Sequence, residues 1–232
     1  MALPADAPGS RSVAMVLMVV GAVAVVGAVA LWRWPRPARA EQPAHPRSAQ
    51  EVVVIGDSVT YASSPAIYAR LEDWGEVDIT PRPFYRAADL VEPFQEVIDA
   101  RVAANDPLDR VVVLAGYNDV IRDDRDPSGL PRMLRLSEQF DCAIWLTLPA
   151  RPGGEAAGGE EFDPVEAEAW NERLREAATD RPGVHVSDEW QRLVEADGGA
   201  ALLQEDGVHP LRAGHLALAD AMARALTAEC PG

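Results

Sequence analysis

The chain has 232 residues, enough for one domain with a substantial core in addition to a targeting or membrane segment. It contains no lysine, and from residue 51 onward 16 arginines stand against 35 aspartates and glutamates, a net charge of −19. Such a domain repels the phosphates of nucleic acids and the surfaces of anionic lipids, so we expect neither as a partner of the folded domain. A solvated acidic surface explains the charge without any specific cationic ligand.

An uncharged and almost wholly apolar run covers residues 13–32. A helix of that length, rising ~1.5 Å per residue, is about as long as the hydrocarbon core of a bilayer is thick. We therefore predict a transmembrane anchor, preceded by a short N-terminal tail, residues 1–12. A cleaved signal peptide is the alternative, because Ala38-Arg39-Ala40 resembles a small-residue cleavage site. The run is long for a signal peptide, and an arginine lies inside that site, which favours the anchor.

Residues 33–50 are rich in proline and arginine and predict an extended linker. One arginine precedes the apolar run and four follow it, which by the positive-inside rule would keep the following domain in the cytoplasm. The export-like N-terminus and the two cysteines favour the opposite orientation. We predict a single-pass protein of the cell membrane with its domain outside the cytoplasm; secretion after signal cleavage is the alternative.

Residues 51–232 alternate apolar runs with helix-period stretches, which is typical of a βαβ succession with a parallel sheet. The expected strands are 52–55, 77–80, 110–115, 143–148 and 184–186. The expected helices are 65–73, 87–103, 130–140, 164–179 and 210–228. A Gly-, Ala- and Glu-rich segment, 151–161, predicts a mobile loop. The fold class that follows is a three-layer α/β/α sandwich with a five-stranded parallel sheet.

Ser58 directly follows the first expected strand, within Gly56-Asp57-Ser58. Open parallel sheets bind their ligands at the carboxyl ends of their strands, so a serine here is a candidate nucleophile beside free backbone N–H groups. Capping of the next helix is the alternative role for Ser58. We expect Gly56 and Asp57 to shape the turn.

Asn118 follows the third expected strand, within Gly116-Tyr117-Asn118-Asp119. In a parallel sheet it lies at the same edge as Ser58, and its side-chain amide can donate to a developing oxyanion, worth roughly 3–4 kcal/mol in comparable sites. A plain Asn-Asp turn is the alternative. Gly116 suits the tight bend in either case, and we assign Asp119 to support of the loop.

Asp206 and His209 precede the last expected helix. The carboxylate can reach Nδ1 of His209, fix its tautomer and leave Nε2 free as a base toward Ser58. The other histidines, His45, His185 and His215, have no comparable partner and fit surface or satisfied core positions. Clusters with the spacing of metal ligands are absent from the sequence, so we expect no metal and no cofactor.

Cys142 precedes the fourth expected strand, and Cys230 follows the last helix. Because helices run back against the strands, both should lie at the sheet edge opposite the site. We predict a disulfide between them, which an exported protein permits. Two free thiols in a cytosolic domain are the alternative.

Through these three motifs, the chain resembles the SGNH (GDSL-type) hydrolase family over nearly all of residues 50–228. The resemblance implies a flavodoxin-like sheet and ester, thioester or carbohydrate O-acyl substrates. We separately expect the domain to be monomeric. It makes Ser58 the nucleophile and His209 the base oriented by Asp206. Asn118 and the Ser58 N–H then belong to the oxyanion hole.

The sequence departs from the family pattern at its second motif, which supplies a glycine N–H to the oxyanion hole. No glycine occurs between Gly75 and Gly116, and Ala87 stands at about the corresponding place. We assign Ala87 to the hole as a substitute. The expected function is a membrane-anchored esterase or deacylase that acts on a small-molecule, glycan or lipid ester. The alternatives are a weak or inactive binding module, or an acyltransferase that uses the same residues.

Overall fold

The computed structural model describes residues 51–122, 126–151 and 162–230. Within these ranges, none of the helices is both long and apolar enough to cross a membrane. The predicted tail, anchor and linker, residues 1–50, and most of the predicted loop, residues 152–161, lie outside the described residues.

The five strands form one parallel sheet in the order β2-β1-β3-β4-β5. They are β1 (Val52–Gly56), β2 (Val77–Pro81), β3 (Arg110–Leu114), β4 (Cys142–Leu146) and β5 (Val184–Ser187). All five were predicted, with ends displaced by at most two residues. The Val- and Ile-rich strands at the centre of the sheet are covered on both faces, as a parallel sheet requires.

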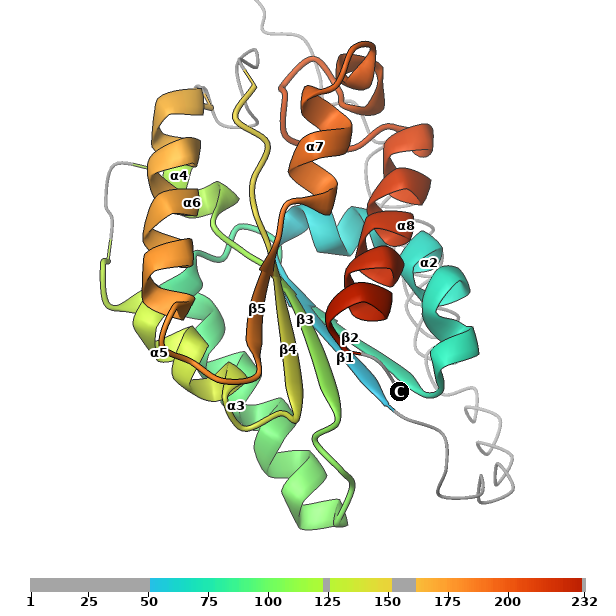
Figure 1. The fold of residues 1–232 in the computed structure, drawn as a ribbon, viewed down its shortest axis with the longest axis vertical. Helices are drawn as coiled ribbons and strands as arrows, with labels where there is room; N and C mark the ends of the chain where they lie inside the picture. Colours follow the sequence, from blue (N-terminus) through green and yellow to red (C-terminus); the bar gives the residue numbers. More distant parts are fainter. Residues whose placement is uncertain (1–50, 123–125, 152–161, 231–232) are drawn as a thin grey trace, which may run out of the picture. The chain divides into compact units, whose positions relative to one another are not determined.

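Helices cover both faces of the sheet (Figure 1). The α-helices are α2 (Ser58–Leu71), α3 (Ala87–Ala104), α4 (Tyr117–Ile121), α5 (Gly129–Ser137), α6 (Pro164–Ala178), α7 (Glu189–Glu195) and α8 (Arg212–Glu229), with short 3-10 helices η1 (Glu72–Trp74) and η2 (Gly199–Leu202). Helix α8 packs between α2 and α7 on one face, and α5 packs against α3 and α6 on the other. The result is the predicted three-layer α/β/α sandwich.

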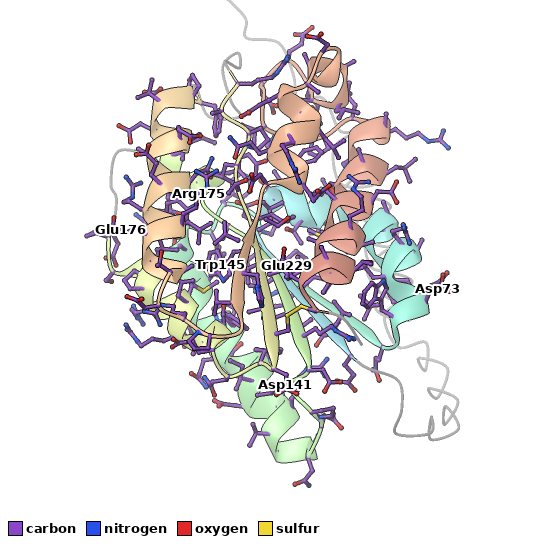
Figure 2. All side chains as sticks on the ribbon, viewed as in Figure 1. Asp73, Asp141, Trp145, Arg175, Glu176 and Glu229 are labelled. Carbon is purple, nitrogen blue, oxygen red and sulfur yellow. A yellow bond between two sulfur atoms is a disulfide. The ribbon has the colours of Figure 1, made fainter. Side chains whose placement is uncertain are left out.

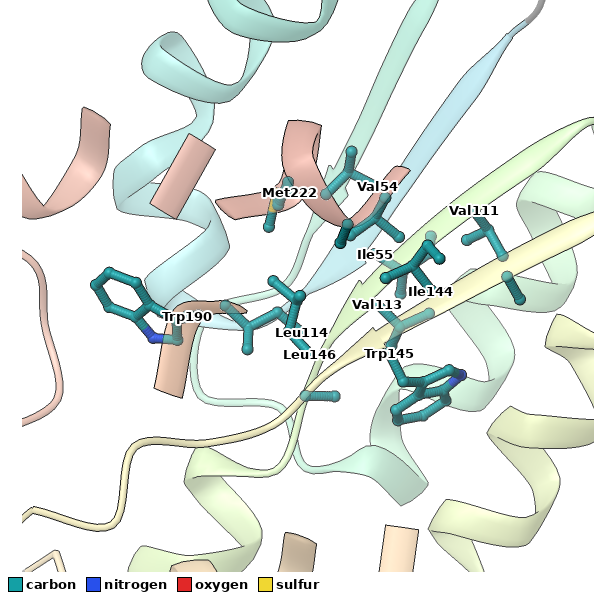
Figure 3. Close-up of a cluster of buried hydrophobic side chains, with 14 of the residues drawn as sticks. Val54, Ile55, Val111, Val113, Leu114, Ile144, Trp145, Leu146, Trp190 and Met222 are labelled. Carbon is teal, nitrogen blue, oxygen red and sulfur yellow. The ribbon is translucent and has the colours of Figure 1, made fainter. Parts of the chain in front are cut away.

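The core lies between the sheet and these two layers (Figure 3). Trp145 of β4 is fully buried on the α5 side, where its indole N–H donates to Ser137 Oγ at 3.0 Å. Trp190 of α7 and Met222 of α8 are fully buried on the other side. Full burial of each such side chain contributes about 1.5–3 kcal/mol, so the core fixes the positions of the strand ends that carry the site.

The main differences from the predicted elements are at helix starts. The helix predicted for 65–73 begins at Ser58, because the Asp57 side chain caps it by accepting the Val59 N–H at 3.0 Å. Pro65 therefore lies inside α2 and does not begin it. The short helices α4 and α7 were not predicted; α4 forms where a plain Asn-Asp turn was the alternative after β3.

The Cys142 and Cys230 sulfurs form a disulfide, with 5.9 Å between the Cα atoms. Cys142 begins β4, and Cys230 follows Glu229 (labelled in Figure 2), the last residue of α8. The bridge therefore lies at the amino ends of the strands, as the sequence predicted. It ties the end of the last helix to β4, the strand next to the sheet edge β5.

Candidate active site

Three adjacent strand ends carry the site. Gly56 at the end of β1 is in register with Pro81 of β2 and Leu114 of β3. The segments that follow these residues contain Ser58, the loop 82–86 and Asn118, respectively. The register of the sheet therefore brings these segments to one edge, where the predicted site was expected.

Ser58 is the first residue of α2 and is hydrogen-bonded to His209. The distance from Ser58 Oγ to His209 Nε2 is 2.9 Å, and the distance from His209 Nδ1 to Asp206 Oδ2 is 2.7 Å. The structure thus brings the three predicted residues together in one chain of hydrogen bonds. The alternative role of Ser58 as a helix cap is taken by Asp57.

The loop before α8 holds both Asp206 and His209 in place. Asp206 Oδ1 accepts the backbone N–H groups of Val208 and His209, each at 2.9 Å, while Oδ2 faces the imidazole. The His209 carbonyl accepts the Gln204 N–H at 2.8 Å, which closes the loop. Both carboxylate oxygens have separate partners, so the carboxylate cannot rotate without losing a hydrogen bond.

The pKa of Asp206 lies below the ordinary value of an aspartate. Partial burial raises it, but the hydrogen bonds from the His209 ring and from the Val208 and His209 N–H groups together outweigh that effect. Asp206 is therefore a carboxylate at neutral pH. An anion beside Nδ1 favours the Nδ1–H tautomer, which leaves Nε2 as an acceptor toward Ser58.

Asn118 is nearly buried at the start of α4. Its Nδ2 donates one hydrogen to the Tyr85 carbonyl at 3.0 Å, which orients the amide and leaves its second N–H for another acceptor. Gly116, just before α4, has a φ of +123°, and a Cβ there would lie 2.4 Å from the Trp170 ring. The bend that presents Asn118 therefore requires a glycine for both reasons.

Ala87 does not have the free N–H that a place in the oxyanion hole requires. Its N–H donates to Asp119 Oδ2 at 2.8 Å in a buried position at the start of α3. The assignment of Ala87 to the oxyanion hole is therefore corrected in this structure, since its donor is already used. Asp119, assigned from the sequence to support of its loop, bonds to the start of α3, 32 residues earlier in the chain.

Asp57 and Asp119, the sequence neighbours of Ser58 and Asn118, have buried carboxyl groups. Burial raises the pKa of Asp57 to about 7, opposed by the Val59 N–H, and the nearby Asp119 raises it further. Burial also raises the pKa of Asp119 to about 6, opposed by the Ala87 N–H. Each carboxyl group holds the first turn of a helix that borders the site: α2 for Asp57, α3 for Asp119.

The loop 82–86 belongs to the site and was not recognised from the sequence. The Arg82 N–H donates to the Gly56 carbonyl at 2.8 Å, and the Tyr85 carbonyl is the acceptor for Asn118. Backbone groups make these contacts, so the residue types give no signal. The position of the loop after β2, beside β1, is the only feature that could have indicated it.

The remaining predicted site features follow the same geometry. A Cβ on Gly56 would lie 2.0 Å from Thr60 Oγ1 and 2.6 Å from the Leu114 carbonyl oxygen, so the strand end needs glycine. His215 Nδ1 pairs with the buried Ser63 Oγ at 2.9 Å, and His185 pairs with Glu229 at 3.3 Å. Neither of these pairs includes Ser58, Asp206, His209 or Asn118.

Several solved structures share this fold. A lipase/acylhydrolase from Enterococcus faecalis has 16% identity and a TM-score of 0.61, over 77% of this chain and 96% of that one. The C-terminal catalytic domain of peptidoglycan O-acetyltransferase A from Streptococcus pneumoniae has 19% identity and a TM-score of 0.58, over 78% and 94%. A member of the lipolytic G-D-S-L family from Veillonella parvula has 20% identity and a TM-score of 0.57, over 76% and 98%.

Among curated proteins, none matches this sequence significantly. The sequence pattern of the GDSL-like lipase/acylhydrolases, in contrast, matches residues 54–217, which run from β1 into α8 and include every residue of the Ser58 site. The fold, the order of the three motifs and this match agree. The chain belongs to the GDSL-like Lipase/Acylhydrolase family.

Proposed function

We propose that the chain is a serine esterase or deacylase, anchored in the membrane by its N-terminal segment. The observation that supports it best is the hydrogen-bonded series Ser58 Oγ–His209 Nε2–Asp206, with distances of 2.9 and 2.7 Å. A hydroxyl in contact with an imidazole, itself oriented by a carboxylate, is the arrangement that makes serine nucleophilic near neutral pH.

In the proposed reaction, Ser58 Oγ bonds to the ester carbonyl carbon while His209 Nε2 takes the hydroxyl proton. The tetrahedral intermediate collapses, the bond to the alcohol oxygen breaks, and His209 returns the proton to that oxygen. Water then adds to the acyl carbon as His209 takes its proton, and the bond to Ser58 breaks as His209 returns that proton to Ser58 Oγ. One ester and one water are consumed, and one acid and one alcohol are formed, without a cofactor.

The oxyanion is proposed to be stabilised by the second N–H of Asn118 and by the backbone N–H of Ser58. Asn118 is held by the Tyr85 carbonyl, and Ser58 is the first residue of a 14-residue helix whose positive end faces the site. Pre-oriented donors of this kind contribute roughly 3–4 kcal/mol each to the transition state.

Hydrolysis of p-nitrophenyl acetate by the purified chain tests the proposal. We expect Ser58→Ala to reduce kcat/KM by at least about a thousandfold, because the residual rate rests on the oxyanion donors alone. Ser64→Ala is the matched control: it makes the same change on the same helix, where Ser64 only bonds back to the Thr60 carbonyl. Turnover that Ser58→Ala leaves unchanged would refute the assignment.

Acyl transfer is a second candidate that the same residues permit, and one structurally similar protein is named a peptidoglycan O-acetyltransferase. Water is then replaced by a hydroxyl of another molecule in the second half of the reaction. Product analysis with excess acceptor alcohol separates the two: an ester product identifies transfer, and free acid identifies hydrolysis. If the chain forms no product and does not react with a fluorophosphonate, it is a binding module with this fold.

The membrane anchor and the extracytoplasmic location are proposals from the sequence of residues 13–32 and from the disulfide, a bond that forms in oxidising compartments. Mass spectrometry of the purified N-terminus distinguishes an anchor from a signal peptide. An intact apolar run in a membrane fraction that resists alkaline carbonate supports the anchor. A mature chain that begins near residue 41 supports secretion.

A further inference from the structure

The loop 82–86 is fixed at both ends to the segments that carry the Ser58 site. The Arg82 N–H donates to Gly56, two residues before Ser58, and the Tyr85 carbonyl accepts from Asn118. The next residue, Ala87, is held by Asp119. Phe84 and Tyr85 are therefore displayed at the edge of the Ser58 site by a rigid backbone.

Phe84 combines a backbone conformation and a side-chain exposure that are unusual for a large residue. Its φ is +67°, in the left-handed region that bulky side chains rarely adopt, and its side chain is 68% exposed. Burial of the ring therefore does not compensate for the strain. Strained residues held by rigid surroundings are concentrated at ligand sites, which indicates that the exposed ring has a binding role.

Tyr61 is a third exposed aromatic residue near the nucleophile. It lies one turn after Ser58 on α2 and is 61% exposed. Ser63 and Arg70, which contact α8, lie on a different flank of the helix. Tyr61 therefore lies on the flank turned away from α8, and on that side α2 borders β2, the strand that leads into loop 82–86.

We propose that Tyr61, Phe84 and Tyr85, here called the aromatic rim, bind the sugar ring of a short-chain acyl sugar, the alcohol part of the ester. This inference rests on the proposed esterase function. Aromatic rings offer flat apolar faces to the C–H face of a sugar, and the tyrosine hydroxyls can bond to its hydroxyl groups. The ester oxygen of the bound sugar would then be presented to Ser58.

Two observations favour a sugar over an acyl chain or a lipid surface. Two hollows in the described residues are lined by none of Ser58, Asp206 and His209: one lies between β2 and α3, the other beside the disulfide. A long acyl chain needs an enclosed apolar channel, whereas a sugar can bind on an open rim. The net charge of −19 from residue 51 onward also opposes contact with an anionic membrane.

The test compares glucose pentaacetate with ethyl acetate, two acetyl esters of which only one has a ring, by acid release in a pH-stat. Phe84→Gly removes the ring and relieves the left-handed strain, and Tyr61→Ala removes the second ring. We expect each to lower kcat/KM for the sugar ester about tenfold and to leave ethyl acetate within twofold. The matched control is Tyr68→Ala, on the same flank of α2 but two turns farther from Ser58, and 53% exposed.

Three results would overturn the proposal. An equal loss for both esters would show that the aromatic rim supports the catalytic residues. A loss that grows from ethyl acetate to ethyl hexanoate would show that it binds the acyl chain. An unchanged rate for the sugar ester would show that it binds neither.

A separate binding measurement keeps this proposal distinct from the esterase proposal. If the wild-type chain hydrolyses neither ester, the esterase assignment fails. Calorimetric titration of Ser58→Ala with glucose pentaacetate then shows whether the aromatic rim binds the sugar ester. Binding that Phe84→Gly weakens about tenfold supports the rim, and absence of binding refutes it.

Discussion

Replacement of Asp206 by asparagine should prevent His209 from acting as a base, without disturbing the loop. Asp206 Oδ1 accepts two backbone N–H groups, and Oδ2 accepts from His209 Nδ1. In the amide, the oxygen must remain on the two N–H donors, because the reversed orientation would place the NH₂ group against both. The NH₂ group then faces Nδ1, which must become an acceptor. The imidazole therefore carries its proton on Nε2 and cannot accept the Ser58 proton.

The expected loss is about ten-thousandfold in kcat at pH 7, as found when the equivalent carboxylate of serine proteases is replaced, or ~5.5 kcal/mol of transition-state stabilisation. The assay is p-nitrophenyl acetate hydrolysis, with thermal unfolding measured in parallel. Asp197→Asn removes the same charge from an exposed position and should leave both unchanged. If Asp206→Asn keeps more than about a tenth of the activity, Asp206 does not set the His209 tautomer, and the reasoning is refuted.

Two further predictions concern stability. Gly116→Ala should lower the free energy of unfolding by ~2–4 kcal/mol, because its Cβ would lie 2.4 Å from the Trp170 ring at a φ of +123°. The control Gly198→Ala, at a φ of +80° with nothing within 4 Å, should show only the loss that comes from the left-handed backbone. Equal losses for the two variants in urea denaturation would contradict the steric argument. Replacing Cys142 and Cys230 by serine should lower the free energy of unfolding by about 4–5 kcal/mol, since the bridge closes a long loop (sequence separation 88). We expect kcat/KM to be unchanged, because the bridge lies at the opposite edge of the sheet from Ser58. A large loss of activity in the folded variant would show that the two edges are coupled.

The sheet and the triad could be predicted because their signals are local. Strands buried on both faces appear as short runs such as Val52–Ile55, and three short motifs mark the strand ends and the last loop. The start of α2 was misplaced because Pro65 resembles a first-turn proline, whereas Asp57 supplies the cap earlier. Two-turn helices such as α7 have too few residues for a period.

The wrong assignment of Ala87 has a different cause. Its N–H donates to Asp119, a residue far away in sequence, and no local pattern of residues indicates such a contact. The contact between Asn118 and the Tyr85 carbonyl has the same character, because every residue has a carbonyl. Long-range bonds to the backbone are therefore the part of this site that only the fold reveals.

The two buried carboxyl groups give a physical reason why these long-range bonds matter. Helices α2, α3 and α4 all begin at the sheet edge that holds Ser58, so their positive ends converge there. Asp57 accepts from the first turn of α2, and Asp119 of α4 accepts from the first N–H of α3. Burial of two carboxyl groups is unfavourable, as their raised pKa values show, and the helix ends offset part of that cost. A site assembled from three separate helix starts needs such cross-links, because the oxyanion donors stabilise a transition state only if they are held in place before the reaction begins.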